Sequence, residues 1–248
     1  MRLLKNRRLR RTPFHRTYPS RSDFVMDHVD RRMAVDRERG FIYFRIPKAA
    51  NSTICYRLAR QKDPTTDNAD DAKRSFMRGS DLTWDEVNNL KDRYYLFAFV
   101  RDPYSRIASA YLDKVERMKP RQQRILFGLQ KDKHTPLSFL EFCRYLDRGG
   151  LYDDPHWFPQ VAFVPFGVSS LNSFYFVERL DEEFSALMSD CSLGAVGFSG
   201  PRESWAPHKT SAGSSLELLY CGESLKIVQS LYERDFASFG FECEVSWM

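Results

Sequence analysis

The sequence predicts an α/β domain with a central parallel sheet flanked by helices, on three observations. Short, wholly apolar runs such as YYLFAFV, residues 94–100, have the composition of strands that are covered on both faces of a parallel sheet. These runs alternate along the chain with segments of helical periodicity, as they do in α/β folds. The 248 residues, 42% of them hydrophobic, suffice for a single domain with a substantial core.

The N-terminal residues 1–38 are predicted to form a basic, flexible segment with little fixed structure before Gly40, which leaves residues 39–248 as the folded domain. Residues 1–16 include seven Lys or Arg and no acid. Such a run is usually a solvated tail, and the alternative is contact with an anionic polymer or peripheral contact with a membrane surface. No long apolar run follows it, so we expect neither a signal peptide nor a transmembrane segment.

The first half of the domain is predicted to contain, in order, a strand at 41–46, a helix at 52–61, a surface loop at 62–73, a short helix from Leu82, a strand at 94–100 and a helix after Pro103. Thr83 and Glu86 have the spacing of a capping box at the start of the short helix. The helix after Pro103 repeats apolar residues at the i, i+3, i+4, i+7 spacing of one buried face. The second half adds a strand at 173–177, a helix from near Asp181 and a helix at 223–239.

The cysteines predict a reducing compartment. There are five, an odd number, and they are widely spaced without a CxxC or Cys/His pattern suited to zinc, at Cys55, Cys143, Cys191, Cys221 and Cys243. We therefore expect buried thiols, no metal site and a cytoplasmic location.

The stretch FIYFRIPKAANSTICYRL, residues 41–58, has the features of a phosphate-binding loop between a strand and a helix. Pro47 fixes the exit from the strand, and Lys48 adds a positive charge at the mouth of the loop. The small side chains of Ala49 and Ala50 allow an anion to approach the backbone closely. The polar side chains that follow, Asn51, Ser52 and Thr53, can cap the helix or donate to phosphate oxygens. A helix cap by Asn51 alone is the structural alternative.

A second segment, FVRDPYSRIASAY, residues 99–111, places Arg101 at the carboxyl end of a core strand, where open α/β sheets bind their ligands. Its guanidinium group can bind a phosphate, and Ser109 can donate a second hydrogen bond. The structural alternative is a local ion pair between Arg101 and Asp102 at a helix start. We expect Arg106 to brace this turn through Asp102.

Together, PKAANST and RDPYSRIASAY resemble the two cofactor segments of sulfotransferases that use 3′-phosphoadenosine 5′-phosphosulfate (PAPS). The resemblance implies a P-loop-type sheet, no metal, and cofactor contacts from two sets of residues. The 5′-phosphosulfate would be held by Lys48, Ala49, Ala50, Asn51, Ser52 and Thr53. The 3′-phosphate would be held by Arg101 and Ser109. Such a nucleotide has no γ-phosphate, which explains why the loop lacks the glycines and the Gly-Lys-Ser/Thr ending of a Walker motif.

Further segments resemble the membrane-type carbohydrate sulfotransferases, known as sulfotransferase family 2: residues 138–160 with their His-Trp-x-Pro-Gln ending, FYFVERLDEEF, WAPHKTSA and YERDFASFGF. The resemblance therefore implies transfer of the sulfuryl group of PAPS to a hydroxyl of an oligo- or polysaccharide. A membrane anchor after the basic start and the cysteine framework of the Golgi enzymes are not evident in this sequence.

In that reaction Lys48 would stabilise the leaving group and His156 would act as the general base. Packing of His156 against Trp157, which would shape the acceptor groove, is the alternative for this histidine, while Trp157 itself could stack on a sugar. His208 is expected to lie in a loop over the nucleotide, and Glu178 to orient another side chain.

Two other functions compete with this interpretation. A P-loop kinase-like phosphotransferase would use the same geometry with ATP, but GxxxxGK[ST] and a magnesium carboxylate are not apparent. A non-enzymatic anion- or nucleic-acid-binding domain would explain the arginine-rich start but not the Lys48 and Arg101 segments, so we expect no specific nucleic-acid partner.

Overall fold

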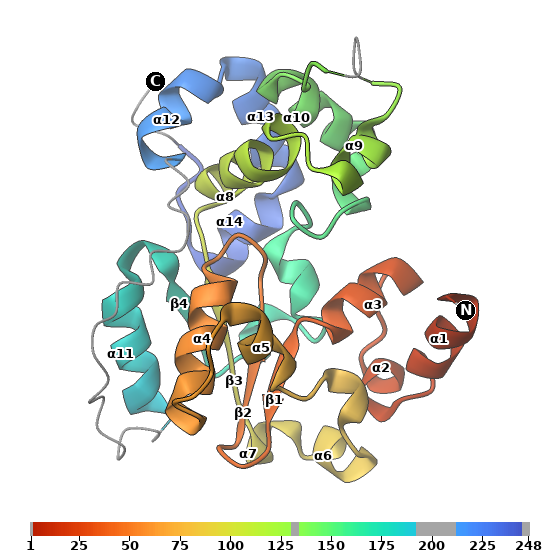
Figure 1. The fold of residues 1–248 in the computed structure, drawn as a ribbon, viewed down its shortest axis with the longest axis vertical. Helices are drawn as coiled ribbons and strands as arrows, with labels where there is room; N and C mark the ends of the chain where they lie inside the picture. The colour runs from red at the N-terminus through yellow and green to blue at the C-terminus, as the bar shows by residue number, and fades with distance from the viewer. Residues whose placement is uncertain (1, 130–133, 192–211, 245–248) are drawn as a thin grey trace. The chain divides into compact units, whose positions relative to one another are not determined.

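The computed structural model describes residues 2–129, 134–191 and 212–244, and these form two compact units (Figure 1). The sheet unit comprises the described parts of Met1–Val100 and Val161–Pro207. The helical unit comprises those of Arg101–Gln160 and His208–Met248. Because the chain passes between the units at three points, no single cut in the sequence separates them.

The sheet unit contains a four-stranded sheet with the order β1-β2-β3-β4. Its strands are β1 Met33–Asp36, β2 Phe41–Phe44, β3 Tyr95–Val100 and β4 Ser173–Phe176. Strands β2, β3 and β4 are parallel, as predicted, and β1 pairs antiparallel with β2. The mixed α/β fold with a mostly parallel sheet is therefore confirmed. Since β2 and β3 are parallel and pair Phe44 with Ala98, the segments that follow them leave the same edge of the sheet.

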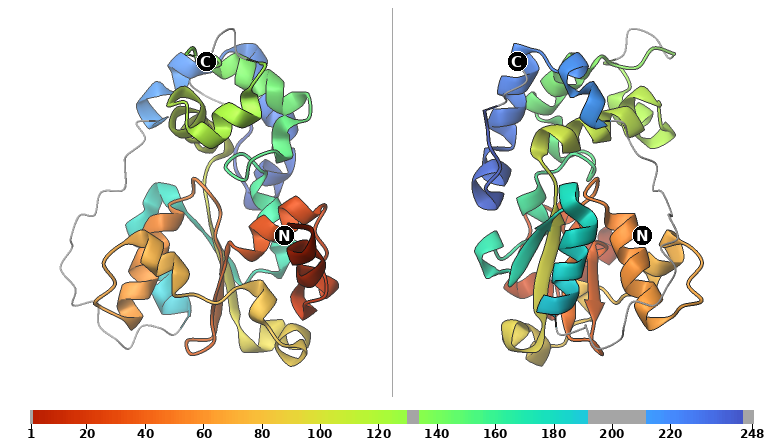
Figure 2. Two further views of the ribbon diagram at one scale, coloured as in Figure 1. Left: turned by 45° about the vertical axis from the view of Figure 1, so that its right-hand side comes forward. Right: turned by 90° about the vertical axis from the view of Figure 1, so that its left-hand side faces the viewer.

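One face of the sheet is covered by helices α4 Asn51–Lys62, α5 Ala69–Arg74 and α11 Leu180–Asp190 (Figure 2). Alternate strand residues point to this face, because strand side chains alternate with a period of two. The buried core there includes Phe41, Tyr43, Phe97, Phe99 and Tyr175 from the strands and Ile54, Cys55, Leu58, Phe184 and Leu187 from the helices. The rings of Tyr43 and Phe97 stack with their centroids 5.1 Å apart.

The expectation of little fixed structure before Gly40 is wrong. Residues 2–36 form helices α1 Arg2–Leu9, α2 Pro13–Thr17 and α3 Asp23–Asp30 and strand β1, and every residue of β1 is buried. In Figures 1 and 2 these helices lie on the face of the sheet opposite α4 and α11. On this side Phe166 contacts the rings of both Tyr18 and Phe44. The prediction failed because it rested on the high arginine content of this segment, whereas the segment is folded by its buried apolar residues, such as Phe14 and Val25.

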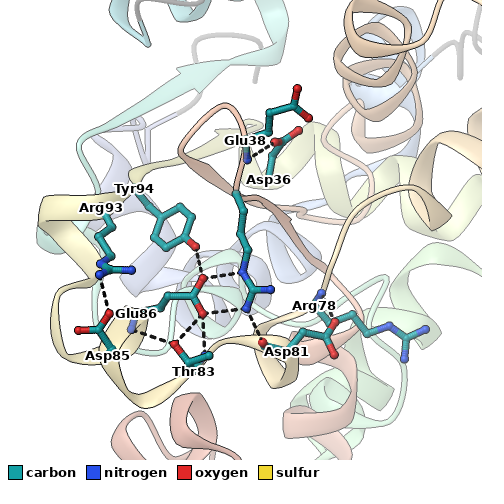
Figure 3. Close-up of polar contacts among 10 residues, drawn as sticks. Asp36, Glu38, Arg78, Asp81, Thr83, Asp85, Glu86, Arg93 and Tyr94 are labelled. Carbon is teal, nitrogen blue, oxygen red and sulfur yellow. Dashed lines mark hydrogen bonds and ion pairs between the residues drawn. The ribbon is translucent and has the colours of Figure 1, made fainter.

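The predicted capping box at Thr83 is confirmed at the start of α6, Trp84–Asn88, and the buried Glu86 belongs to a larger polar cluster (Figure 3). Arg37 donates to both carboxylate oxygens of Glu86, at 2.6 and 2.8 Å. The hydroxyl of Tyr94, which follows helix α7 Leu90–Arg93, donates to Oε1 at 2.6 Å. These bonds join α6 to the residues that flank β1 and β3. The hydrogen bond from Arg37 is the main reason that the pKa of Glu86 is far below its usual range.

The helical unit packs around an apolar core that contains Tyr104, Phe142, Trp157 and Tyr232. Its helices are α8 Pro103–Ala110, α9 Pro120–Leu126, α10 Phe139–Asp147, α12 Ala212–Leu219, α13 Gly222–Leu231 and α14 Glu233–Phe239, and α8 continues as a π-helical turn, Tyr111–Glu116. The predicted helix at 223–239 is thus two helices, which meet at Tyr232. None of the helices in the described ranges has the length and apolar composition needed to cross a membrane.

Candidate functional site

The loop between β2 and α4 has a strained backbone at two of the predicted phosphate-binding residues. Lys48 has a φ of 68° and Ala50 a φ of 48°, and neither is glycine. A left-handed conformation costs a residue with a Cβ roughly 1–2 kcal/mol. Left-handed residues beside helical ones can turn successive N–H groups toward one point and form an anion-binding concavity. Strain of this kind is concentrated at ligand sites, which makes this loop a candidate.

Helix α4 begins at this loop without a side-chain cap. Its N-cap residue is Ala50, so the structural alternative in which Asn51 caps the helix is wrong. The Asn51 side chain instead accepts a hydrogen bond from Nε of the buried Arg45 at 3.0 Å. The first N–H groups of a helix have no acceptor within the helix, and the helix dipole makes this end positive. The start of α4 therefore offers uncapped donors and positive potential to an anion.

Thr53, in the first turn of α4, carries a buried polar atom that lacks a partner. The residue is 6% exposed, and among the described residues its Oγ1 has no hydrogen-bond partner. Such a hydroxyl is unfavourable to bury unless something bonds to it. A phosphate or sulfate oxygen at this helix start would supply an acceptor. The residues present thus fit the phosphate end of a nucleotide.

The RDP segment begins directly after the last residue of β3, Val100. Asp102 caps α8 by accepting from the backbone N–H of Ser105 at 2.8 Å, and burial raises its pKa. Ser109 lies near the end of α8 and is 1% exposed. Both residues predicted to hold a 3′-phosphate are therefore in the helical unit, one before α8 and one within it.

Gln160, the last residue of the His-Trp-x-Pro-Gln element, binds the backbone of Arg101 at both polar atoms. Its Oε1 accepts from the N–H of Arg101 at 3.0 Å, and its Nε2 donates to the carbonyl oxygen at 2.8 Å. The backbone N–H of Gln160 in turn donates to Oδ2 of Asp235 in α14 at 2.7 Å. Gln160 and Asp235 are both fully buried. The sequence analysis assigned no role to either residue.

Arg106 also contacts a segment outside its own turn. It is fully buried and donates from Nη2 to the carbonyl oxygen of Phe158 at 2.6 Å. Burial lowers its pKa, and the nearby charge of Asp235 opposes that effect. Three segments that lie about 50 to 130 residues apart in the sequence are thereby joined in one polar network: RDPYSR, HWFPQ and YERDF.

His156 is oriented by Asp154. Nδ1 of the imidazole lies 2.5 Å from Oδ1 of Asp154, and the backbone N–H of His156 donates to the same oxygen at 2.9 Å. Gln122 donates to the other oxygen at 2.7 Å, and Nε of Arg121 is 3.2 Å from it. Burial of Asp154 would raise its pKa, but the bonds and charges of His156 and Arg121 outweigh it and bring the pKa to about 2.

An ionised carboxylate that accepts from Nδ1 of an imidazole fixes the ring and its tautomer and stabilises the protonated ring. The side chain of His156 is 24% exposed, so the group retains access to solvent. Asp153, the other acid that could have oriented the ring, accepts from the hydroxyl of Tyr145 at 2.6 Å instead. The pair Asp154–His156 therefore has the chemistry of a general base.

Trp157 does not offer its ring to a sugar. It is fully buried, its Nε1 donates to the carbonyl oxygen of Gly150 at 2.9 Å, and its ring packs against Phe142 and Tyr145. Glu178, which we expected to orient another side chain, lies exposed in the 3-10 turn Val177–Arg179 after β4. His208 and the WAPHKTSA segment lie outside the described residues.

Comparison with known proteins agrees with these features. The model of the sulfotransferase family matches residues 31–242, which include the loop, the RDP segment and His156. Carbohydrate sulfotransferase 14 of Danio rerio is 25% identical, with 96% of this chain and 71% of that protein covered. The Mus musculus and Homo sapiens proteins of the same name are 28% and 24% identical over 83% of this chain and 58% of theirs. No solved structure matches.

The family match covers most of the chain and extends through both units. It begins just before β1 and ends after α14, so the whole sheet and the polar network around Gln160 fall inside it. On this evidence the chain belongs to the sulfotransferase family.

Proposed function

We propose that this protein transfers the sulfuryl group of PAPS to a hydroxyl of a carbohydrate acceptor. The observation that carries the proposal is the start of α4, where an uncapped helix, two left-handed residues and the orphaned Thr53 hydroxyl lie in one loop. The choice of a carbohydrate rests on the relatives, which are carbohydrate sulfotransferases by name. Since the mouse and human relatives are much longer than the matched region, the acceptor sugar belongs to the proposal as well.

The donor would be held at its two charged ends. Lys48, Ala49, Ala50, Asn51, Ser52 and Thr53 would bind the 5′-phosphosulfate, and Arg101 and Ser109 would bind the 3′-phosphate. Bound PAPS supplies an activated sulfuryl group whose leaving group is adenosine 3′,5′-bisphosphate. Backbone N–H groups at the start of α4 suit an anion without a metal ion, because they are fixed donors that need no reorganisation.

Lys48 and His156 would carry the chemical step. The ammonium group of Lys48 would stabilise negative charge on the leaving oxygen. His156 would accept the proton of the attacking hydroxyl, and Asp154 would stabilise the imidazolium that results. Lys48 would thus stabilise charge on the leaving group, while His156 would take the proton from the attacking group, as two residues do in other in-line transfer reactions.

A cytoplasmic location and peripheral membrane contact are further parts of the proposal. All five cysteines are free thiols, which fits a reducing compartment. Exposed arginines of the N-terminal segment, among them Arg7, Arg8 and Arg11, fit an anionic surface. Thiol labelling in cells and flotation with anionic vesicles would test these two points.

Calorimetric titration tests the nucleotide assignment, with adenosine 3′,5′-bisphosphate, AMP and ATP as ligands. The proposal predicts that the bisphosphate binds much more tightly than AMP, and that ATP gains nothing from magnesium. Arg101→Ala should remove most of the preference, because a charge-assisted contact is worth about 1.5–3 kcal/mol. Equal affinity for the bisphosphate and AMP in the intact protein would contradict the assignment, and tight magnesium-dependent binding of ATP would favour the kinase alternative.

A further inference from the structure

Gln160 forms an unusual contact with Arg101, in which one side-chain amide binds both polar atoms of one residue's backbone. The N–H and carbonyl oxygen of one residue are usually both bound in this way by a neighbouring antiparallel strand, as in a sheet ladder. Arg101 follows β3 at the point where the chain leaves the sheet, and here a glutamine side chain supplies the donor and the acceptor. The side-chain amides of Gln and Asn carry a donor and an acceptor side by side on one planar group.

Gln160 is itself held in place by a buried carboxylate. Its backbone N–H donates to Asp235, a carboxylate that is itself fully buried in α14, and the charge of Asp235 acts on the buried guanidinium of Arg106. A buried ionised group costs free energy even when paired, and apolar residues of similar size often stabilise a protein better. The buried charges of Asp235 and Arg106 lie in the same network as Arg101, so we interpret them as groups that fix the geometry of this site at some cost in stability.

The backbone of Arg101 is therefore fixed before any ligand binds. Its N–H and carbonyl oxygen are both bound, so the peptide groups on either side of its Cα have little freedom to rotate. A long arginine side chain loses less freedom on binding when the backbone that bears it is already ordered. The fork of a guanidinium group also binds a phosphate best in one orientation.

We propose that Gln160 is a positioning residue for the 3′-phosphate of the donor nucleotide, acting through the backbone of Arg101 and held in place by Asp235. This inference rests on the proposed function, because it takes Arg101 as the 3′-phosphate ligand. It assigns the glutamine of the His-Trp-x-Pro-Gln element and the aspartate of YERDF to nucleotide recognition, whereas His156 of the same element acts on the acceptor.

The test compares adenosine 3′,5′-bisphosphate with AMP, which lacks the 3′-phosphate, as ligands in calorimetry. Gln160→Met keeps the side-chain length and removes both bonds to Arg101. It should weaken bisphosphate binding about 10–100-fold, because the contact between Arg101 and the 3′-phosphate is weakened. AMP binding should change by less than about threefold. The matched control is Tyr111→Phe, which removes a buried hydrogen bond to the carbonyl oxygen of Leu137 in the same unit. It should leave the ratio of the two affinities unchanged.

Retention of the wild-type ratio in Gln160→Met, or an equal loss of both affinities, would overturn the inference. A wild-type protein that binds the two nucleotides equally would instead reject the proposed function. If Gln160→Met does not fold, amide hydrogen exchange of the wild-type protein provides the decision. The N–H of Arg101 should be protected without nucleotide, and rapid exchange there would contradict the positioning role.

Discussion

Lys48 combines a strained backbone with a charge at the mouth of the phosphate loop. A φ of 68° is unfavourable for lysine, and glycine would relieve the strain. A lysine at this position is therefore explained by its side chain rather than by its backbone. An ammonium group that stabilises the leaving oxygen acts mainly in the transition state, so its loss should affect turnover more than binding.

Lys48→Ala should lower the rate of sulfuryl transfer by about 10²–10⁴-fold and leave the affinity for adenosine 3′,5′-bisphosphate within roughly tenfold. Steady-state kinetics together with calorimetry measure the two effects separately. The control is Lys62→Ala, at the exposed C-terminal end of the helix that follows the loop, α4, and it should retain full turnover. A loss confined to nucleotide affinity would make Lys48 a binding residue only.

At His156 the structure supplies an orienting group, the buried carboxylate of Asp154. His156→Ala should reduce transfer by about 10²–10⁴-fold with nucleotide affinity unchanged, and the acidic limb of the pH–rate profile should disappear. Asp154→Asn should lower the rate in the same direction, because the imidazolium loses its buried counter-charge. His134→Ala, exposed in the same unit, should be silent. Near-normal turnover in His156→Ala would return this histidine to a packing role.

At the scale of elements, α6 depends on Glu86 for its attachment to β1. The carboxylate is bound by Arg37, Tyr94 and the backbone and hydroxyl of Thr83, so its ionised form is strongly favoured in the folded state. Its pKa is lower when folded than the roughly 4.3 of an unfolded glutamate. The unfolded state therefore binds a proton first as the pH falls. This contribution to stability is complete above pH 5 and decreases steadily below about pH 4.

Glu86→Gln should destabilise the protein at pH 7 by about 1–3 kcal/mol, a range that allows for solvent screening of the partly exposed Arg37. Urea unfolding at pH 7, 5, 4 and 3 gives the measurement. The wild-type free energy of unfolding should fall toward that of Glu86→Gln as the pH decreases, because the unfolded state takes up a proton that the folded carboxylate does not bind. Asp85→Asn, on the exposed side of α6, is the control. Parallel curves for the wild type and Glu86→Gln would reject the linkage.

Local patterns in the sequence predicted the elements that depend on local physics. The capping box at Thr83, the buried strand at 95–100 and the helix after Asp102 all follow from residue type and spacing, and the structure contains them. The N-terminal segment could not be predicted this way. Its strand β1 is stabilised by pairing with β2, and the composition of a four-residue segment, MAVD, does not reveal a partner.

The residues of the candidate site show the same difference between local patterns and long-range contacts. The residues of the phosphate loop could be predicted because they form a contiguous motif. Gln160 and Asp235 could not, because they act through contacts between segments that are distant in the sequence. Arg45 could not, because it belongs to no motif, although it binds Asn51 of the loop. Trp157 misled for a similar reason. A tryptophan in a polar segment suggests a sugar-stacking ring, but its N–H finds a buried acceptor at Gly150.

At the scale of the whole molecule, the family match extends through both units. Lys48 lies in the sheet unit, and Arg101, Ser109 and His156 lie in the helical unit. Activity should accordingly require the intact chain.

The most direct test of the proposal is incubation of the purified protein with ³⁵S-labelled PAPS and a panel of polysaccharides, including Lys48→Ala as a blank. Label should be transferred to at least one polysaccharide in the absence of metal ions, with adenosine 3′,5′-bisphosphate released in equal amount. Transfer should fall with Lys48→Ala and with His156→Ala. Absence of transfer to any carbohydrate by a folded protein that binds the bisphosphate, or transfer that survives both substitutions, would contradict it.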